Sequence, residues 1–321
     1  MKPFSTAIYD SVQNITVKYA RFNEISEELD HITALARDHQ SPEGYCVMGL
    51  SGLGKTLLLK LHEAKYPEVR NETHLCRPVI RIKMPAKPTE MALLYVLALA
   101  FGEQYTGGRS YQLYSRVVKL LKQCQTHTIL IDEAQHMVRR KSSDDAKLAA
   151  DTLKNIMDEA VVSIVLAGVP EVEDILLANK QLRGRFTGIA VYEPWVVVPA
   201  TVNKDKSEIN EGVLTQFSGI LYALVKKSEY QGDFSILSRP DVIRRIYFAT
   251  DGRIRYMSRL IAATLAVAIP NEIPKLELSH LSKAFLRKIH PRAKPEGNPF
   301  DDAFVERRLI LKGEPFWGDD E

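Results

Sequence analysis

The chain has 321 residues, of which 45% are hydrophobic and 26% are charged, and its formal net charge is +3. This composition is that of an ordinary globular protein, and the charge is too small to identify a nucleic-acid-binding protein, so any basic surface must be local. The longest apolar runs, 91–101 and 260–270, are shorter than the roughly 18 residues of a membrane span. With no apolar signal segment at the start and only three cysteines, we expect a cytoplasmic protein without membrane contact.

Short apolar runs alternate with helical patterns before residue 200. The runs lie at 45–50, 77–84, 127–132, 161–168 and 188–194. The helical patterns lie at about 22–37, 56–66, 89–102, 110–124, 144–160 and 171–180. Because each run is continuously apolar, we expect the strands of a parallel sheet that helices cover on both faces. Residues 1–200 are therefore predicted to form one α/β domain that includes an N-terminal helical segment.

The pattern changes after Pro199. From about 206 to 292 only helical periodicity remains, interrupted by SRPD and TDG segments that are typical of helix boundaries. We predict a small all-helical domain over 201–292. Residues 293–321 are rich in proline, glycine and acidic side chains, so they are predicted to form a tail or docking peptide rather than a core, with plain disorder as the alternative.

Residues 49–56 read GLSGLGKT, which matches the P-loop pattern G-x-x-x-x-G-K-[ST] between a predicted strand and a predicted helix. Glycines let the backbone curl so that its N–H groups surround phosphates. Lys55 would place a charge on the β- and γ-phosphates, and the Thr56 hydroxyl would take one Mg²⁺ position. The nucleotide-binding residues predicted from this loop are Gly49, Ser51, Gly52, Leu53, Gly54, Lys55, Thr56 and Leu57.

Asp132 and Glu133 follow the apolar run that ends at 132, as a Walker B pair should. The aspartate would hold Mg²⁺, commonly through water, and the glutamate would polarise the attacking water as the catalytic base. A GTPase is the natural rival, and its base-reading signature is N-K-x-D. Residues 203–206 read NKDK, with Lys206 where the acidic residue should be, so we expect ATP and Mg²⁺.

Arginines at two places are candidates for contacting the phosphates. Arg185, and as second choice Arg183, stand at a helix end just before the fifth strand, where they would face a neighbouring subunit's γ-phosphate in a ring. Solvated helix-end arginines are the alternative. The predicted helical domain would act as a lid over the nucleotide. From this domain Arg255, and as second choice Arg253, would contact the phosphates.

The fourth predicted strand ends in VLAGVPE, with Ala167, Gly168 and Val169. ATPases of this kind usually carry a polar side chain here that helps to hold the attacking water. Its absence leaves the hydrolysis step less well defined than nucleotide binding.

The motifs GLSGLGKT, ILIDEAQHM, VLAGVPE and QLRGRF, in this order and spacing, resemble those of the TnsC/TniB-type AAA+ regulators of DNA transposition. The resemblance extends over residues 15–290 and implies a P-loop AAA+ fold with a parallel five-stranded sheet and a helical lid. It also implies a bacterial protein that assembles with ATP into rings or filaments on double-stranded DNA. Such a protein bridges a TniQ-like target selector, with an RNA-guided complex as one option, and transposase subunits that the C-terminal tail would contact.

DNA binding without sequence preference requires cations and hydrogen-bond donors directed at phosphates. Two segments, 105–112 and 139–141, carry such groups, and we expect both on loops near the nucleotide. The candidates are Arg109, Ser110 and Tyr111 in the first segment, Arg139, Arg140 and Lys141 in the second, and more weakly Lys119. For each segment the alternative is a solvated basic loop. A ring of subunits would multiply these contacts.

Two other functions remain open on the sequence. One is a replication initiator or helicase loader, which shares part of the motif set. The other is a nucleotide-dependent scaffold ATPase that does not bind DNA.

Overall fold

The computed structural model describes residues 2–39, 41–70, 75–85, 89–104, 109–137, 143–195 and 211–318. The chain divides into two compact units. Residues 20–193 form an α/β unit, and the residues up to Tyr19 form a helical unit together with those from Pro194 onward. The chain therefore enters the α/β unit after Tyr19 and returns to the helical unit after Glu193.

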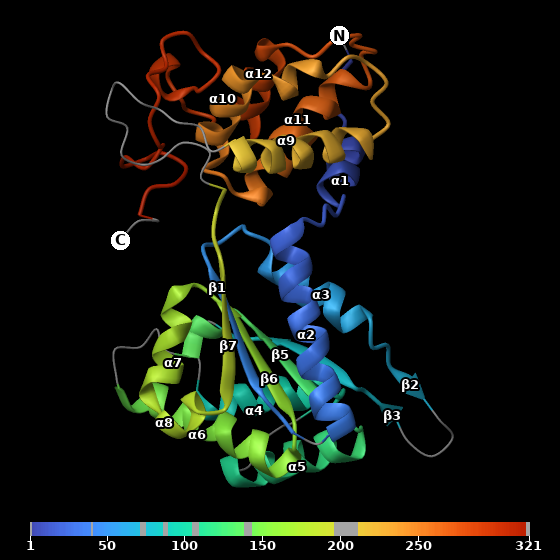
Figure 1. The fold of residues 1–321 in the computed structure, drawn as a ribbon, viewed down its shortest axis with the longest axis vertical. Coiled ribbons are helices and arrows are strands. Elements are labelled where there is room, and N and C mark those ends of the chain that lie inside the picture. The colour runs from blue at the N-terminus through green and yellow to red at the C-terminus, as the bar shows by residue number, and fades with distance from the viewer. Residues whose placement is uncertain are drawn as a thin grey trace. The chain divides into compact units, whose positions relative to one another are not determined.

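A parallel sheet forms the centre of the α/β unit (Figure 1). Its strands are β1 (Gly44–Gly49), β4 (Val79–Lys83), β5 (Thr128–Asp132), β6 (Ser163–Gly168) and β7 (Phe186–Tyr192). They pair in the order β4-β5-β6-β1-β7, and every pair is parallel. β1, β5 and β6 are buried along their whole length, which explains why each reads as a continuous apolar run. The five-stranded parallel sheet confirms the predicted fold class.

Helices cover both faces of this sheet. They are α2 (Ala20–His39), α3 (Lys55–Ala64), α4 (Glu90–Ala100), α5 (Ser110–Gln123), α6 (Ser143–Ala160), α7 (Glu173–Ala178) and α8 (Lys180–Arg183). α2 packs against α3 on one face, whereas α4, α5 and α6 share an apolar core with the strands on the other (Figure 1). A short antiparallel pair, β2 (Val69–Arg70) and β3 (Leu75–Cys76), is not among the predicted elements, because two-residue strands have no readable periodicity.

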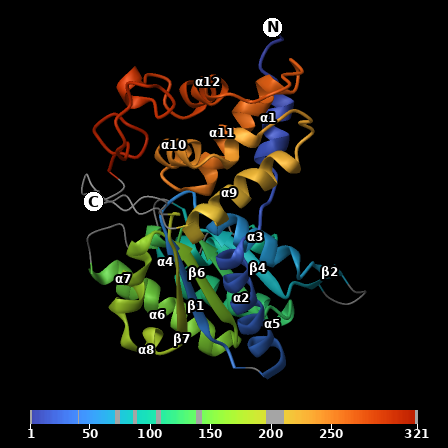
Figure 2. The same ribbon diagram turned by 45° about the horizontal axis from the view of Figure 1, so that its top comes forward.

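The helical unit contains α1 (Thr6–Gln13), α9 (Glu211–Lys226), α10 (Pro240–Thr250), α11 (Ile254–Ala268) and α12 (Leu278–Lys288). α10 and α11 begin where the SRPD and TDG segments predict helix boundaries. α1 packs along α11, and the Ser5 N–H donates to the Ala266 carbonyl over 2.9 Å (Figure 2). The residues up to Tyr19 thus belong to the helical unit, not to the α/β domain in which we expected them. Val12 is buried in the core of the helical unit, and periodicity alone does not specify which core a helix joins.

The C-terminal segment is folded into the helical unit, which corrects the prediction of a tail over 293–321. Phe300 and Phe316 are buried in the same core as the helices. Arg308 donates to the buried Asp251 through Nε at 2.7 Å and Nη2 at 2.9 Å. The proline-rich and acidic composition indicated a solvated segment, but a few aromatic side chains and one buried ion pair are enough to anchor it.

Among the helices of the described ranges, none has the length and apolarity that crossing a bilayer requires.

The burial of the C-terminal segment leads to a stability prediction. Phe316→Ala removes a fully buried ring that Tyr256 meets edge-on, and it should lower the free energy of unfolding by about 3 kcal/mol. Trp317→Ala is the matched control, because that ring is 60% exposed and its loss should cost no more than about 0.5 kcal/mol. Chemical denaturation measures both values. Equal effects of the two substitutions would contradict the folded segment.

A buried polar cluster joins α2, α3 and β5 on the face of the sheet that α2 and α3 cover. His62 is 1% exposed, and its Nε2 lies 2.9 Å from the Thr33 hydroxyl oxygen. Thr128 donates to the same hydroxyl over 3.1 Å. His62 Nδ1 lies 3.3 Å from Asp30 Oδ1. Burial lowers the pKa of His62 from 6.5 to about 4, against the opposing charge of Asp30.

The pKa of His62 predicts how stability depends on pH. Below about pH 6.5 the unfolded chain binds a proton at this histidine, whereas the folded chain does so only near pH 4. Its contribution is therefore complete above pH 6.5 and lost as the pH falls towards 4, by about 3 kcal/mol in total. Unfolding midpoints between pH 7 and 4 should fall more steeply for the wild type than for His62→Gln. The exposed His31→Gln control should follow the wild type, and parallel curves for all three proteins would refute the prediction.

Candidate functional site

The GLSGLGKT loop connects β1 to α3 at the carboxyl edge of the sheet. Gly49 ends β1 directly beside β7: a Cβ here would lie 2.3 Å from the Tyr192 carbonyl oxygen, so only glycine fits. Gly54 precedes α3 with a φ of 103°, a conformation that L side chains rarely adopt. The other predicted loop residues divide into the exposed or half-buried Ser51, Thr56 and Leu57 and the buried Gly52 and Leu53.

Lys55 is held over its own loop. The side chain is 8% exposed, and its Nζ donates to the Gly49 carbonyl at 2.6 Å and to the Leu50 carbonyl at 2.9 Å. Neutral carbonyls are weaker partners for an ammonium group than phosphate oxygens are. The lysine is therefore placed at the loop mouth with contacts that an incoming phosphate can replace.

Asp132 and Glu133 lie at the same edge of the sheet as the loop. Because β1 and β5 are parallel, their carboxyl ends meet at one edge, with β6 between them. Asp132 is buried, and its Oδ1 accepts the Glu133 N–H at 3.0 Å. Glu133 has a φ of 56°, which is uncommon for a residue other than glycine and typical of functional turns. The fold thus brings the two predicted motifs together.

The residues at this edge fit a magnesium ion. Mg²⁺ takes oxygen ligands and is usually held by one or two carboxylates together with substrate phosphates. The Asp132 carboxylate is buried, where a negative charge is costly unless a cation or hydrogen bonds compensate it. Within the described ranges no group of three or more His, Cys, Asp or Glu side chains could hold a metal by itself. The ligands predicted from the sequence, Thr56 and Asp132 together with phosphate, remain a prediction.

Gln135 is not among the predicted site residues, although it lies within the motif ILIDEAQHM. It is 2% exposed in the short helix η1 (Ala134–Met137) that follows Glu133. Its Nε2 donates to Glu133 Oε2 at 2.6 Å, and its Oε1 accepts the Val169 N–H at 3.3 Å. The signal that could have found it is Gly168, which ends β6 without a side chain in the place where a polar one is expected.

Arg185 and Arg183 are both engaged with carboxylates. Arg185 binds Asp158 through Nε at 2.8 Å and Nη2 at 2.7 Å, and Arg183 lies 3.6 Å from Glu173. They stand just before β7, at the amino edge of the sheet, and β7 spans about 20 Å to the carboxyl edge. Neither arginine is therefore placed to reach the loop of its own α/β unit.

The two arginines of the helical unit that are predicted to contact nucleotide, Arg253 and Arg255, differ in exposure. Arg253 is 2% exposed, donates to Asp251 at 3.0 Å and lies over the Phe316 ring at 5.2 Å. It anchors the C-terminal segment, so the expectation that it binds nucleotide is corrected. Arg255 is exposed in the first turn of α11 and remains the candidate.

The predicted DNA contacts are partly described. Arg109 and Tyr111 are exposed at the start of α5, Ser110 is half-buried beside them, and Lys119 is exposed further along the helix. Arg139, Arg140 and Lys141 lie outside the described residues.

α5 does not lie near the nucleotide loop. This corrects the expectation that the segment with Arg109, Ser110 and Tyr111 lies close to the nucleotide. The Arg77 N–H, just before β4, donates to the Cys124 carbonyl after α5 over 2.7 Å. Tyr114 hydrogen-bonds Glu159 near the end of α6. Both contacts place α5 along the amino edge of the sheet, at the end opposite the loop (Figure 1). The reason is that α4 has already returned the chain to this edge before α5 begins.

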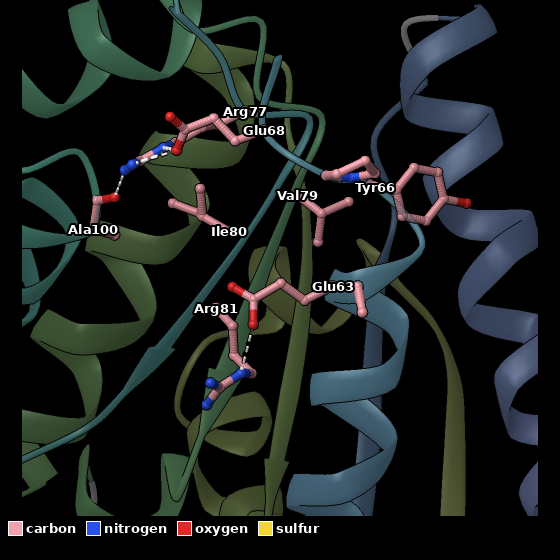
Figure 3. Close-up of a pocket in the computed structure, with 10 residues that line it drawn as sticks. Glu63, Tyr66, Glu68, Arg77, Val79, Ile80, Arg81 and Ala100 are labelled. Carbon is pink, nitrogen blue, oxygen red and sulfur yellow. Dashed lines mark hydrogen bonds and ion pairs between the residues drawn. The ribbon is translucent and has the colours of Figure 1, made fainter. Parts of the chain in front are cut away.

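A cavity of about 410 Å³ beside the edge strand β4 is separate from the nucleotide loop (Figure 3). Glu63 pairs with Arg81 over 2.9 Å, and Glu68 pairs with Arg77, whose guanidinium also donates to a backbone carbonyl. These charged side chains, which line the cavity, therefore form ion pairs with one another. The cavity adjoins the end of α3, about 15 Å along the helix from the loop at its start.

Solved structures share this fold. The Aeropyrum pernix ORC2 protein in ADPNP–ADP complexes has a TM-score of 0.61 at 13% identity, over 91% of this chain and 76% of that chain. CDC6p from Pyrobaculum aerophilum has a TM-score of 0.60 at 14% identity, over 86% and 70%. The Aeropyrum pernix ORC1 protein in complex with DNA has a TM-score of 0.58 at 18% identity, over 88% and 69%. At these identities the likeness shows the fold alone.

The sequence comparisons identify the family. No curated protein sequence matches this chain significantly. Residues 9–196 match the family model described as bacterial TniB protein. The matched range contains the P-loop, both carboxylates of the Walker B pair and Arg185. Because it covers more than half of the chain, the chain belongs to the TniB family of bacterial proteins, as its motifs predict.

Proposed function

We propose that this protein is an ATPase that assembles on double-stranded DNA in its ATP-bound state and regulates transposition there. The observation that carries the proposal is that the P-loop with Lys55 and the Walker B pair Asp132 and Glu133 lie at the same edge of the sheet in a chain of the TniB family. Hydrolysis would then disassemble the oligomer. We expect turnover to be slow or controlled by partners.

The chemistry of the site follows from the placement of its groups. Backbone N–H groups of the loop surround the phosphates, and Lys55 exchanges its carbonyl contacts for phosphate oxygens. Thr56 and Asp132 would hold Mg²⁺, which supplies charge stabilisation at the phosphates when bound. Glu133 accepts a proton from the attacking water as general base.

Oligomerisation would complete the site. Arg185 stands too far from its own loop to contact its own nucleotide, which favours a role on a neighbouring subunit's γ-phosphate. Arg183 is the second candidate. Asp158 holds the Arg185 guanidinium in a fixed orientation, so the group would be presented without a large loss of side-chain entropy. Arg255 would contact the phosphates from the helical unit.

DNA contacts would come from exposed cations that do not read bases. Arg109, Ser110, Tyr111 and Lys119 form one candidate set on α5, and Arg139, Arg140 and Lys141 form the other. Each phosphate neutralised adds to the salt dependence of binding, so contacts repeated around a ring produce a steep dependence even when each subunit contributes few.

The partners proposed for a bacterial cytoplasmic regulator of this kind are a TniQ-like target selector and transposase subunits. If the C-terminal segment takes part, its exposed side chains would carry the contact, because Phe300 and Phe316 are buried. The exposed apolar residues there are Val305, Leu311 and Trp317.

A filter-binding assay with random double-stranded DNA tests the proposal. The wild-type chain should retain DNA with ATP or a non-hydrolysable analogue and release it without nucleotide, and electron microscopy of the retained species should show oligomers. DNA binding that ignores nucleotide, or ATP hydrolysis with no DNA binding at all, would refute the proposal. The second result would favour a scaffold ATPase, and preference for one duplex sequence would favour a replication initiator.

A further inference from the structure

The end of β6 occupies the centre of the candidate ATPase site. β6 lies between β1, which leads into the P-loop, and β5, which ends at Asp132. A side chain at the last residues of β6 would therefore face both the phosphates and the catalytic carboxylate. The last two residues of β6, Ala167 and Gly168, and the following Val169 have no polar side chain.

The Gln135 side chain fills this position from η1, the short helix that follows β5. A Cβ added at Gly168 would lie 2.2 Å from Gln135 Oε1 and 2.4 Å from Val172 Cγ2. A side chain on β6 and the amide of Gln135 therefore exclude each other, and the glycine makes room for the amide. Gln135 Oε1 accepts the Val169 N–H at 3.3 Å, so the amide is tied to the end of β6.

The contacts of Gln135 determine which way its amide points. The Val169 N–H can only donate, so it must meet the amide oxygen. This leaves the amide nitrogen to donate to Glu133 Oε2 at 2.6 Å, and a carboxylate can only accept. The amide therefore has one arrangement in which both neighbours are satisfied. Because Gln135 is 2% exposed, water does not compete strongly for these contacts.

We propose that Gln135 is the positioning residue for Glu133, and that it takes over the role of the polar side chain missing from β6. The amide fixes the carboxylate of the general base relative to the end of β6, and thereby relative to the water that Glu133 activates. Its second amide hydrogen would donate towards that water or the γ-phosphate once nucleotide is bound. This inference rests on the proposed ATPase function.

Two substitutions separate positioning from packing. Gln135→Met keeps the length of the side chain and removes both hydrogen bonds. Gln135→Glu keeps an acceptor for the Val169 N–H but replaces the donor to Glu133 with a second negative charge. If Gln135 only packs and caps Val169, Gln135→Met should change the melting temperature but not the hydrolysis rate. If it positions Glu133, Gln135→Glu should be at least as impaired as Gln135→Met.

The experiment measures single-turnover ATP hydrolysis with DNA, nucleotide Kd with a fluorescent ATP analogue, and the melting temperature of each variant. We expect the hydrolysis rate to fall about 10- to 100-fold in both variants, as when an outer group that orients a reacting one is lost. Nucleotide Kd should stay within about twofold, because the P-loop contacts are untouched. Gln216→Met, on the exposed face of α9, is the control and should change nothing.

Each outcome decides the question. A wild-type rate in Gln135→Met, or an equal loss of rate and nucleotide affinity in both variants, would overturn the positioning role. If Gln135→Met does not fold, a wild-type rate in Gln135→Glu would still overturn it. An inactive wild type would refute the proposed function and this inference together, whereas an active wild type with active Gln135 variants would refute only the inference.

Discussion

Glu133→Gln should leave ATP bound and lower its hydrolysis by about two to four orders of magnitude, the usual contribution of a general base. Glutamine has nearly the shape of glutamate but cannot take a proton from water. Glu133 is half-buried directly after β5, and its carboxylate accepts a hydrogen bond from Gln135, whereas the predicted phosphate contacts come from the P-loop. Nucleotide affinity should therefore be unchanged, and the DNA-bound oligomer should persist because it is no longer disassembled.

Steady-state phosphate release and nucleotide binding measured on the same preparation test this prediction. Glu171→Gln is a suitable control, since it makes the same chemical change at an exposed carboxylate just beyond β6. Hydrolysis within threefold of the wild type in Glu133→Gln would remove the glutamate from the role of base. The remaining candidates for that role would then have to lie outside the Walker B pair.

Lys55→Ala should abolish both nucleotide binding and assembly. The Lys55 ammonium is nearly buried at the loop mouth, where its hydrogen bonds to charged phosphate oxygens would be worth about 3 kcal/mol. Nucleotide affinity should therefore fall by about 100-fold or more. Lys60→Ala removes an exposed lysine from the same helix, so it controls for the change in net charge and should bind nucleotide normally.

The two substitutions should have opposite effects on assembly. Glu133→Gln should accumulate oligomers on DNA in the presence of ATP, and Lys55→Ala should form none at any practical ATP concentration. Sedimentation with and without nucleotide distinguishes them. Identical behaviour of the two variants would contradict the division of labour between the P-loop and the Walker B pair.

The parts of the fold that could be predicted are those in which local pattern and burial agree. β1, β5 and β6 are buried on both faces, so their apolar runs identify them, and the glycines of the P-loop mark the turn that follows β1. The nucleotide motifs were found because their residue types are required by phosphate chemistry at fixed spacing. Asp132 and Glu133 could be identified from the apolar run next to them, without information from distant parts of the chain.

The features that could not be predicted depend on contacts between distant residues. Phe316 is buried because α10–α12 provide a core for it, and nothing in its own neighbourhood in the sequence says so. The sequence around Arg253 does not indicate its burial, because its contacts include Phe316 in the distant C-terminal segment as well as Asp251. Gln135 lies within the motif ILIDEAQHM, but its role could not be predicted, because it depends on the space that Gly168 leaves at the end of β6.

The division of the chain between the units also determines the order in which they can fold. The α/β unit is one continuous stretch, 20–193, so all of its strands leave the ribosome before the helical unit is complete. The helical unit instead joins α1 at the start to α11 more than 200 residues later, and it buries Phe316 near the end of the sequence. During synthesis α1 must therefore wait without its partner while the α/β unit forms, and contacts at such long separation form slowly. A nascent chain of this protein would therefore contain a folded α/β unit, with its P-loop and Walker B pair, before its helical unit is complete.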